Sequence, residues 1–489
     1  MGIESTPAEP GNGRLRGDAL GVAGIVFLVL AAVAPLTGII VIATLGIADG
    51  NGGGMPVSFL LAAVVLLLFG TGYAQMSRHV ASAGGFFAYV TRALGRPPGL
   101  VAAFVALLGY NCFVAGAIGT SGFFTAKVFG EVLGLHTPWQ LWSGLSVLAV
   151  FLLGRRGVDV SAKLLGASLV LEVGILLVLD VAILARDGLS LEIFTPSVMV
   201  SGSVGLGLLF AFNAFVGFEA TGLFSEEARN PARTIPRATY TAVALIGLFA
   251  AFTSWCLISA VGAGRAGAVA GAHLAAGDFV QSIAIREIGP VLTDAMMLLL
   301  VVSLFAALLA LHNSASRYLF ALGRAAVLPK ALGRTVPRTG APAVASAVQI
   351  GFATAVAACY AIAGLDPVAD LTASMTGIGT LGIIVLQAMA AIAIVVFFRR
   401  RGDRRWWKTL LAPVLGGLGL LGVTVLAVVN FGELAGSDSP VIAQLPWLLL
   451  FALAAGLARS WWMRRFRRTE YGELEHTEEP PRKELDVRG

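Results

Sequence analysis

The stretch Ala34-Pro35-Leu36-Thr37-Gly38 interrupts one long apolar run, and Asn213-Ala214-Phe215-Val216-Gly217-Phe218-Glu219 interrupts another. A proline at position 35 removes a backbone N–H and clashes with the preceding turn, and Gly38 lets the chain leave helical geometry easily. Unpaired peptide groups are costly in lipid, so such breaks persist where they line a cavity or meet a ligand. The two stretches therefore predict two discontinuous membrane helices.

The composition places these breaks in a membrane protein. Of the 489 residues, 57% are hydrophobic and only 13% are charged, whereas soluble domains carry about 25% charged residues. This balance excludes an ordinary soluble enzyme, a disordered protein and a nucleic-acid-binding protein. The three cysteines, Cys112, Cys256 and Cys359, lie in apolar runs without paired spacing, so we expect neither a disulfide framework nor a metal site.

Apolar runs long enough to cross a bilayer recur along the whole chain. About 20 apolar residues span the hydrocarbon core as a helix, and the alternation typical of a barrel is absent. The predicted fold class is therefore an all-α membrane protein with twelve transmembrane helices. The expected spans cover residues 19–47, 56–76, 99–129, 138–154, 161–185, 203–226, 237–262, 289–321, 342–362, 371–398, 409–431 and 441–463.

The interrupted spans are the first and the sixth, and the two longest spans are the third and the eighth. Each span thus resembles the one five places later, and because five is odd the second set enters from the opposite side. This predicts a 5+5 inverted repeat, a plan found in many transporters. The expected parts are an N-terminal tail (1–17), a transmembrane domain (18–463) and a C-terminal tail (464–489), with the repeats at 18–186 and 201–398 and two further helices at 409–463.

Basic residues indicate the orientation. All but four of the 34 lysines and arginines fall in segments that share one side if the N-terminus is cytoplasmic; the exceptions are Lys127, Arg186, Arg265 and Arg286. The positive-inside rule then predicts a multi-pass protein of the plasma membrane with both termini in the cytoplasm. Anchoring at lipid headgroups explains the basic runs without any role in nucleic-acid binding.

The freed peptide groups at the breaks suggest a binding site. The N–H groups after Thr37 would begin a half-helix whose positive end favours a carboxylate. The carbonyls before Pro35, and those near Asn213 to Val216, would favour an ammonium group. Together they would form a receptor for a zwitterion. A simple proline kink packed against its neighbours is the alternative, and the matching break in the sixth span favours a site.

Two carboxylates lie within apolar spans, where charge is costly and usually functional. Glu219 either accepts hydrogen bonds from the unwound backbone as a fixed group or titrates during transport. Glu172 either carries a proton or makes an interhelical hydrogen bond. Both are candidates for proton coupling.

Further polar and aromatic side chains are candidates for substrate contact. Tyr110 and Asn111 lie in the third span, where interhelical hydrogen bonding explains them equally well. Phe212 and Phe215 are candidate aromatic gates, with packing as the alternative. No phosphate-binding loop or H-E-x-x-H motif occurs. We therefore expect no cofactor, no metal and no enzymatic activity.

The sixth span and its exit carry a specific motif, which resembles the helix-six signature of the amino acid–polyamine–organocation (APC) permease family. Supporting matches follow the second span and end the eighth, and the resemblance covers about residues 18–460. The matching stretches are Gly217-Phe218-Glu219-Ala220-Thr221, Ser225-Glu226-Glu227-Ala228-Arg229-Asn230-Pro231, Arg233-Thr234-Ile235-Pro236-Arg237-Ala238, Gly84-Gly85-Phe86-Phe87-Ala88-Tyr89 and Ser314-Ala315-Ser316-Arg317-Tyr318-Leu319-Phe320-Ala321-Leu322.

The resemblance implies a LeuT-like fold and secondary transport of amino acids or related amines by alternating access. It also implies that the substrate is held by backbone groups of Ala34, Pro35, Leu36, Thr37 and Gly38, and of Asn213, Ala214, Phe215, Val216 and Gly217. This chain departs from many relatives in three places. Its first break is not of the Gly-Ser-Gly type, Asn213 stands where relatives carry an aromatic gate, and Glu172 is the mid-helix ionisable residue where some relatives have lysine.

The sequence thus predicts a permease that imports an amino acid or amine by proton symport. An exchanger of the same class remains the main alternative, and a non-transporting amino-acid sensor or a membrane-embedded enzyme is a less favoured one. The expected partners are a small-molecule substrate, membrane lipid and a coupling proton, with no nucleic acid. The oligomeric state is not assigned.

Overall fold

The computed structural model describes residues 20–80, 85–155, 158–222, 224, 227–274, 276–337, 339–429, 431 and 444–474. Within these ranges the chain is helical, and its only sheet-like pairing is a single bridge between Leu20 and Ala228. The predicted all-helical class is confirmed. The expected N-terminal tail (1–17) and the end of the expected C-terminal tail (475–489) lie outside the described residues.

The first half of the chain holds the first five expected spans. Three of its helices, α3, α5 and α7, run without interruption through the length of a span. The elements are α1 (Val22–Val33), α2 (Pro35–Thr37), η1 (Gly38–Ala43), η2 (Gly46–Gly50), η3 (Gly52–Gly54), α3 (Met55–Met76), α4 (Phe86–Leu94), α5 (Arg96–Leu133), α6 (Trp139–Gly154) and α7 (Val158–Arg186).

The second half begins with short elements and continues with long helices. The elements are η4 (Leu191–Phe194), α8 (Pro196–Met199), α9 (Val204–Ala214), η5 (Phe218–Gly222), α10 (Pro231–Val261), η6 (Ala263–Arg265), α11 (Ala266–Ala272), α12 (Phe279–Arg324), η7 (Lys330–Gly333), α13 (Ala343–Ile362), η8 (Pro367–Thr372), α14 (Ala373–Arg400), η9 (Trp407–Leu411), α15 (Ala412–Val429), α18 (Trp447–Phe466) and α19 (Arg468–Glu473).

Eight helical segments among the described residues are long and apolar enough to cross a membrane, and α6 and α9 are shorter apolar helices. The helices α7 and α18 occupy the two remaining expected spans. The count of twelve crossings, the inverted repeat and the domain boundaries stay predictions.

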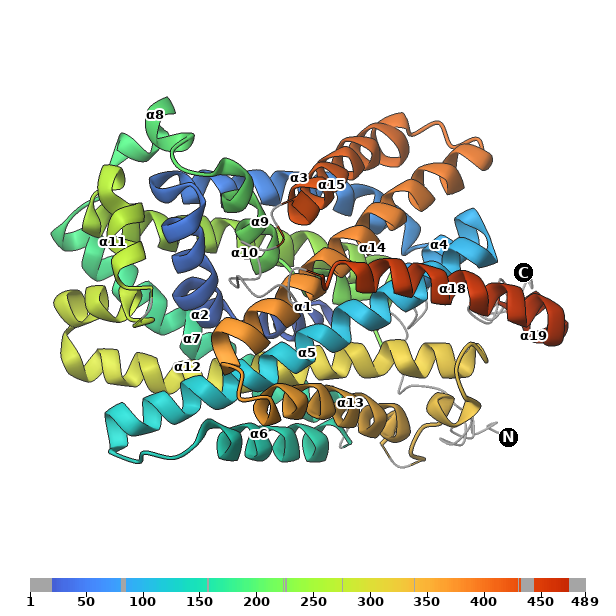
Figure 1. Ribbon diagram of the computed structural model, residues 1–489. Coiled ribbons are helices and arrows are strands. Elements are labelled where there is room, and N and C mark those ends of the chain that lie inside the picture. The colour runs from blue at the N-terminus through green and yellow to red at the C-terminus, as the bar shows by residue number, and fades with distance from the viewer. Residues whose placement is uncertain are drawn as a thin grey trace, which may run out of the picture.

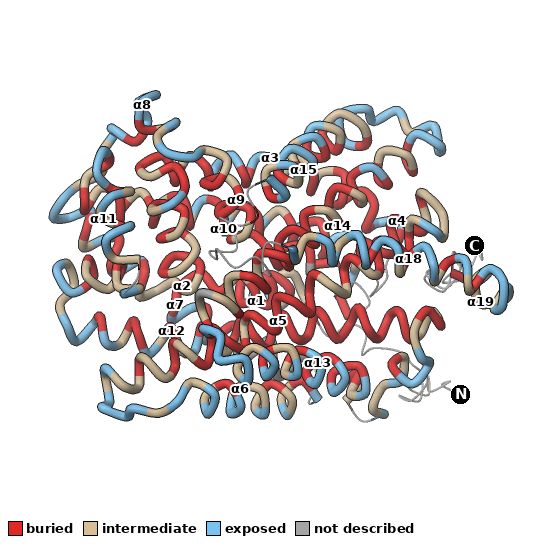
Figure 2. Tube along the Cα trace, viewed as in Figure 1, coloured by how far each residue is buried: buried red, intermediate tan, exposed pale blue. Residues whose placement is uncertain are grey.

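The long helices α5 and α12 run through the middle of the bundle (Figure 1). The helix α5 packs against α12, α14 and α18, and α1 packs against α7, α10 and α12. Figure 2 shows that buried residues gather around α1 and α5 and that exposed residues lie on the outer helices. The two predicted breaks therefore lie in the interior, where neighbouring helices can satisfy freed backbone groups.

Candidate functional site

A cavity of about 110 Å³ lies between the two predicted breaks. A single water needs only about 10–15 Å³ of such space, so the cavity has room for a small solute. It is lined by Ala32, Val33, Ala34, Thr37, Gly38, Val41, Ile42, Phe113, Ala117, Thr120, Asn213, Ala214, Val216, Leu304, Ala307, Leu311, Thr372 and Thr376. Six of the predicted substrate-binding residues, three from each break, thus share one cavity.

The first break is a single left-handed residue. Ala34 has φ 50° and ψ 77°, and α2 begins directly after it with Pro35. The expectation that the chain leaves helical geometry at Gly38 is wrong, because Gly38 is helical and its N–H donates to Ala34 O at 2.7 Å. The unpaired donors of the new helix start instead belong to Leu36 and Thr37, since first-turn N–H groups have no intrahelical acceptor.

The second break is wider. The helix α9 ends at Ala214, and a turn leads to Gly217, whose φ of 116° is a conformation that favours glycine. The chain resumes as η5 rather than as a long helix. Position 217 also lies close to α1, because a Cβ there would come within 3.1 Å of the Ala32 Cβ. The two breaks are therefore in direct contact.

Glu219 holds the second break in place. Its Oε2 accepts the Gly217 N–H at 3.0 Å, and its Oε1 accepts the Tyr110 hydroxyl at 2.9 Å. Gln387 of α14 lies 3.5 Å from Oε2, and the Tyr73 hydroxyl donates to the Glu219 backbone carbonyl at 3.3 Å. The side chain is buried and connects η5 to α5 and α14, and the backbone carbonyl of Glu219 adds the link to α3. This geometry favours the fixed, hydrogen-bonded alternative for Glu219.

Glu172 lies at the end of a short chain of hydroxyl groups. The Thr37 hydroxyl donates to Ser303 Oγ at 3.3 Å, and the Ser303 hydroxyl donates to Glu172 Oε2 at 2.6 Å. Thr37 lines the cavity, Ser303 belongs to α12 and Glu172 to α7, and Glu172 is buried. The cavity is thereby linked through one serine to a buried carboxyl group.

The other predicted residues lie near the cavity but do not line it. Pro35, Leu36, Phe212, Phe215 and Gly217 belong to the breaks, and none of them is part of the cavity wall. Tyr110 reaches Glu219, as described above.

Asn111 lies in a separate polar network. Its amide donates to Leu107 O at 2.7 Å and accepts from Gln349 at 3.4 Å, and Gln349 in turn bonds to His312. This contact fits the interhelical alternative for Asn111.

Three threonines that the sequence did not single out contribute polar groups to the cavity: Thr120, Thr372 and Thr376. Thr120 and Thr372 lie 2.9 Å apart and both bond to Gly116 O. Threonine in a membrane helix usually bonds to its own backbone, so its presence gives no sequence signal for a site. Asn213, which also lines the cavity, donates from its side-chain amide to Thr380 Oγ1 at 2.8 Å.

A family model described as "amino acid permease" matches residues 20–455, which is most of the chain. The chain belongs to the amino acid permease family. The resemblance to APC-family permeases is thereby confirmed, as is the expectation that the protein is not an enzyme. Amino acid transport is the activity of the family, and this permease is a multi-pass membrane protein.

Two curated relatives are named for the same class of substrate. The permease is 26% identical over 434 residues to the branched-chain amino acid permease BcaP of Bacillus subtilis (strain 168), covering 85% of this chain and 87% of that protein. It is 27% identical over 400 residues to BcaP of Lactococcus lactis subsp. cremoris (strain MG1363), covering 76% and 81%. A methylthioribose transporter of B. subtilis (strain 168) is 25% identical over 328 residues, covering 63% and 67%.

The fold has a solved counterpart. The permease matches the crystal structure of a single-residue mutant of the Eremococcus coleocola manganese transporter with a TM-score of 0.54 over 93% of this chain and 95% of that chain. The sequence identity of 15% limits this likeness to the fold. The helical arrangement is therefore that of a known transporter.

Proposed function

We propose that this permease imports an amino acid with a small apolar side chain across the plasma membrane, by alternating access and in symport with a proton. The cavity between the two breaks carries the proposal. Thr37 lines the cavity, and its N–H group lies at the positive end of a new helix, which suits the substrate carboxylate. The end of α1 offers carbonyl groups on the other side of Ala34, which suit the ammonium group.

The remaining cavity wall supports an apolar substrate. Aliphatic and aromatic side chains surround the break, whereas no charged side chain is among the described residues that line the cavity. A charged substrate side chain would be left without a partner, at a cost of several kcal/mol. The names of the two BcaP relatives agree with this selection. The apolar lining residues are Val33, Val41, Ile42, Phe113, Ala117, Leu304, Ala307 and Leu311.

The hydroxyl chain from the cavity supports proton coupling at Glu172. An ionisable group within a membrane span is costly to keep charged, and such groups commonly form proton relays in transporters. Gain or loss of a proton at Glu172 changes the hydrogen bond from Ser303, which in turn bonds to Thr37 at the cavity. Proton binding and the first break are thus coupled through a single serine.

Uptake into proteoliposomes tests the transport proposal. Purified permease should accumulate labelled leucine, isoleucine or valine when the outside is more acidic than the inside, and accumulation should stop when the pH gradient is dissipated. Lysine and glutamate should compete poorly. Uptake that does not depend on the pH gradient but increases with internal leucine would show that the permease is an exchanger instead.

Glu172→Gln tests the coupling residue. The variant keeps the size of the side chain and cannot release a proton, so it should lose proton-driven accumulation and retain leucine counterflow. Thr424→Val, at a threonine whose hydroxyl bonds to its own helix, is a matched control that should leave both unchanged. Normal accumulation by Glu172→Gln would rule out this residue as the proton carrier.

A further inference from the structure

A second cavity, of about 810 Å³, shares no lining residue with the substrate cavity. It opens between α5, the turn that follows α12, and the helices α18 and α19. We call it the basic pocket. It is lined by Phe104, Val327, Leu328, Pro329, Lys330, Arg459, Trp462, Arg467 and Glu470.

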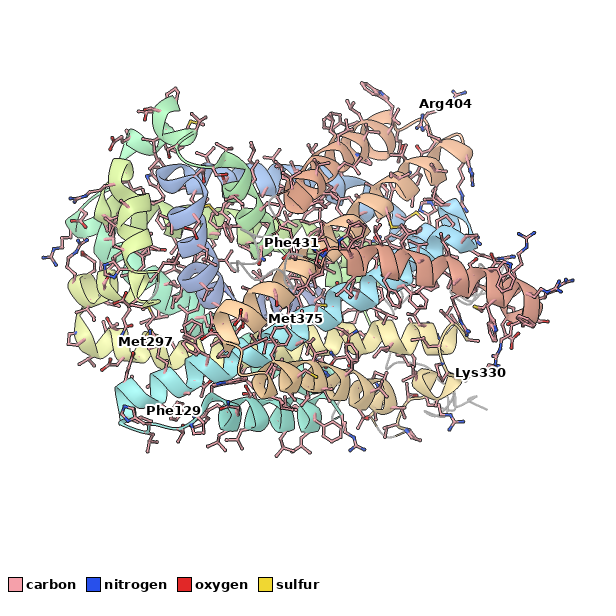
Figure 3. All side chains as sticks on the ribbon, viewed as in Figure 1. Phe129, Met297, Lys330, Met375, Arg404 and Phe431 are labelled. Atoms are coloured by element: carbon pink, nitrogen blue, oxygen red, sulfur yellow. The ribbon has the colours of Figure 1, made fainter. Side chains whose placement is uncertain are left out.

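Positive charge predominates in the basic pocket. Lys330, Arg459 and Arg467 face a single carboxylate, that of Glu470. Three more arginines, at positions 464, 465 and 468, lie exposed on the same two helices. Figure 3 shows Lys330 at the edge of the molecule, near α19 at the right of the view. The pocket therefore attracts anions.

The cations are positioned by the pocket itself. Arg459 donates to Val327 O at 2.8 Å and lies 4.2 Å from the centroid of the Trp462 ring, and Arg467 lies 5.6 Å from the same ring. These contacts hold both guanidinium groups beside one aromatic surface. Two arginines fixed at one site form a cradle for a phosphate group, since guanidinium binds phosphate in a bidentate way.

Glu470 forms only weak ion pairs with the cations of the basic pocket. It lies 3.9 Å from Lys330 and 3.6 Å from Arg467, and these cations are 70% and 42% exposed. Exposed ion pairs at such distances contribute little to stability. A phosphate with a stronger charge and more acceptor oxygens can therefore displace this carboxylate.

The other wall of the pocket is apolar. Phe104, Val327, Leu328 and Pro329 line the pocket beside the cations. A small soluble anion such as phosphate has no apolar part that could contact this wall. A phospholipid has one, because its acyl chains lie next to its phosphate. The pocket thus matches a molecule that is anionic at one end and apolar at the other, which is the chemistry of the lipid that surrounds a multi-pass protein.

We propose that the basic pocket binds an anionic phospholipid, with the headgroup phosphate at Lys330, Arg459 and Arg467 and an acyl chain along Phe104 and Leu328. This inference does not depend on the identity of the transported substrate or on proton coupling.

Native mass spectrometry of the detergent-solubilised permease tests the proposal. Phosphatidylglycerol should bind in preference to phosphatidylcholine with the same acyl chains. The double variant Lys330→Gln/Arg467→Gln should weaken phosphatidylglycerol binding about thirtyfold, since each basic residue near a membrane surface contributes about one kcal/mol. Glu470→Gln should tighten binding, because it removes the competing carboxylate.

The matched control is Arg404→Gln/Lys408→Gln, which removes two exposed basic residues from another part of the chain (Arg404 is labelled in Figure 3). It should leave phosphatidylglycerol binding unchanged. Equal binding of the two lipids, an equal loss in the control, or no gain in Glu470→Gln would overturn the proposal. Displacement of the lipid by excess inorganic phosphate would show a site for soluble anions instead.

Discussion

At the residue scale, the position of the first break depends on Ala34 rather than on glycine. A left-handed alanine costs about 1–2 kcal/mol relative to a helical one, and Pro35 after it disfavours the helical region for the residue that precedes it. Gly38 serves a different purpose. Because Gly38 has no side chain, the cavity reaches the helix backbone at this position.

Gly38 therefore tests the cavity. The nearest atom to an added Cβ is Val33 O at 3.8 Å, so Gly38→Ala should fold and transport. Gly38→Leu should fill the cavity and raise the Kd for leucine about tenfold or more, since overpacking costs about 1–3 kcal/mol. Binding is measured by isothermal titration calorimetry.

The control for Gly38→Leu is Gly351→Leu, at an exposed helical glycine of α13 with open space around it. It should bind leucine as the parent does. Unchanged affinity in Gly38→Leu would refute a substrate site at the first break.

Glu219 is the second test at this scale. As a fixed acceptor it receives the Gly217 N–H and the Tyr110 hydroxyl on its two oxygens. Glu219→Gln replaces one oxygen with a donor, so one of these donors is left buried and unpaired, which should lower the free energy of unfolding by about 1–3 kcal/mol. Thermal unfolding measures this loss. A variant as stable as the parent that has lost the pH dependence of uptake would instead show that Glu219 titrates.

Part of the site could be read from the sequence and part could not. Proline and glycine within apolar runs mark the breaks, because they change the backbone itself. The sequence could not show that Ser303 connects Thr37 to Glu172, since serine is common in membrane helices and the three residues come from three different spans. Nor could it show that Gly38 stays helical, because helical geometry there depends on the hydrogen bond to Ala34 O.

At the element scale, an ion pair ties the loop after η5 to the end of α12. The Arg317 guanidinium donates to both oxygens of Glu227, at 2.7 and 3.1 Å, and lies 4.6 Å from the centroid of the Phe224 ring. Both side chains are nearly fully buried. The backbone around Glu227 also pairs with Leu20, just before α1. Three segments distant in sequence are therefore held at one point.

Removing one partner of this pair should be far more harmful than removing both. Arg317→Gln leaves a buried carboxylate unpaired and should lower the free energy of unfolding by about 3–5 kcal/mol, as should Glu227→Gln. The double variant leaves two neutral groups that can bond to each other, and should be more stable than either single variant. Denaturant unfolding of the parent, the two single variants and the double variant completes a double-mutant cycle. Additive losses would contradict the pairing.

At the scale of the whole molecule, the positions of the spans could be predicted from the sequence more easily than the packing contacts between them. Helices such as α3 and α13 begin and end within a few residues of the expected runs, because hydropathy sets which residues leave water. The element α12 begins ten residues before its expected span, but Gly289 (φ 76°, ψ 170°) is not helical and Pro290 follows it, so two helices meet at the residue where the span was expected to begin. Which helices meet depends on close packing, and hydropathy carries little information about that.

The whole molecule must expose the substrate cavity to each side of the membrane in turn if it transports by alternating access. Ala117 of α5 lines the cavity and provides a reporter position. In a Cys359→Ser background, which removes the exposed native thiol while Cys112 and Cys256 stay buried, Ala117→Cys should react with an impermeant maleimide added to either face of vesicles. Saturating leucine should suppress both reactions, because it occupies the same space. The background without Ala117→Cys should not be labelled, and labelling from only one face under every pH gradient would contradict alternating access.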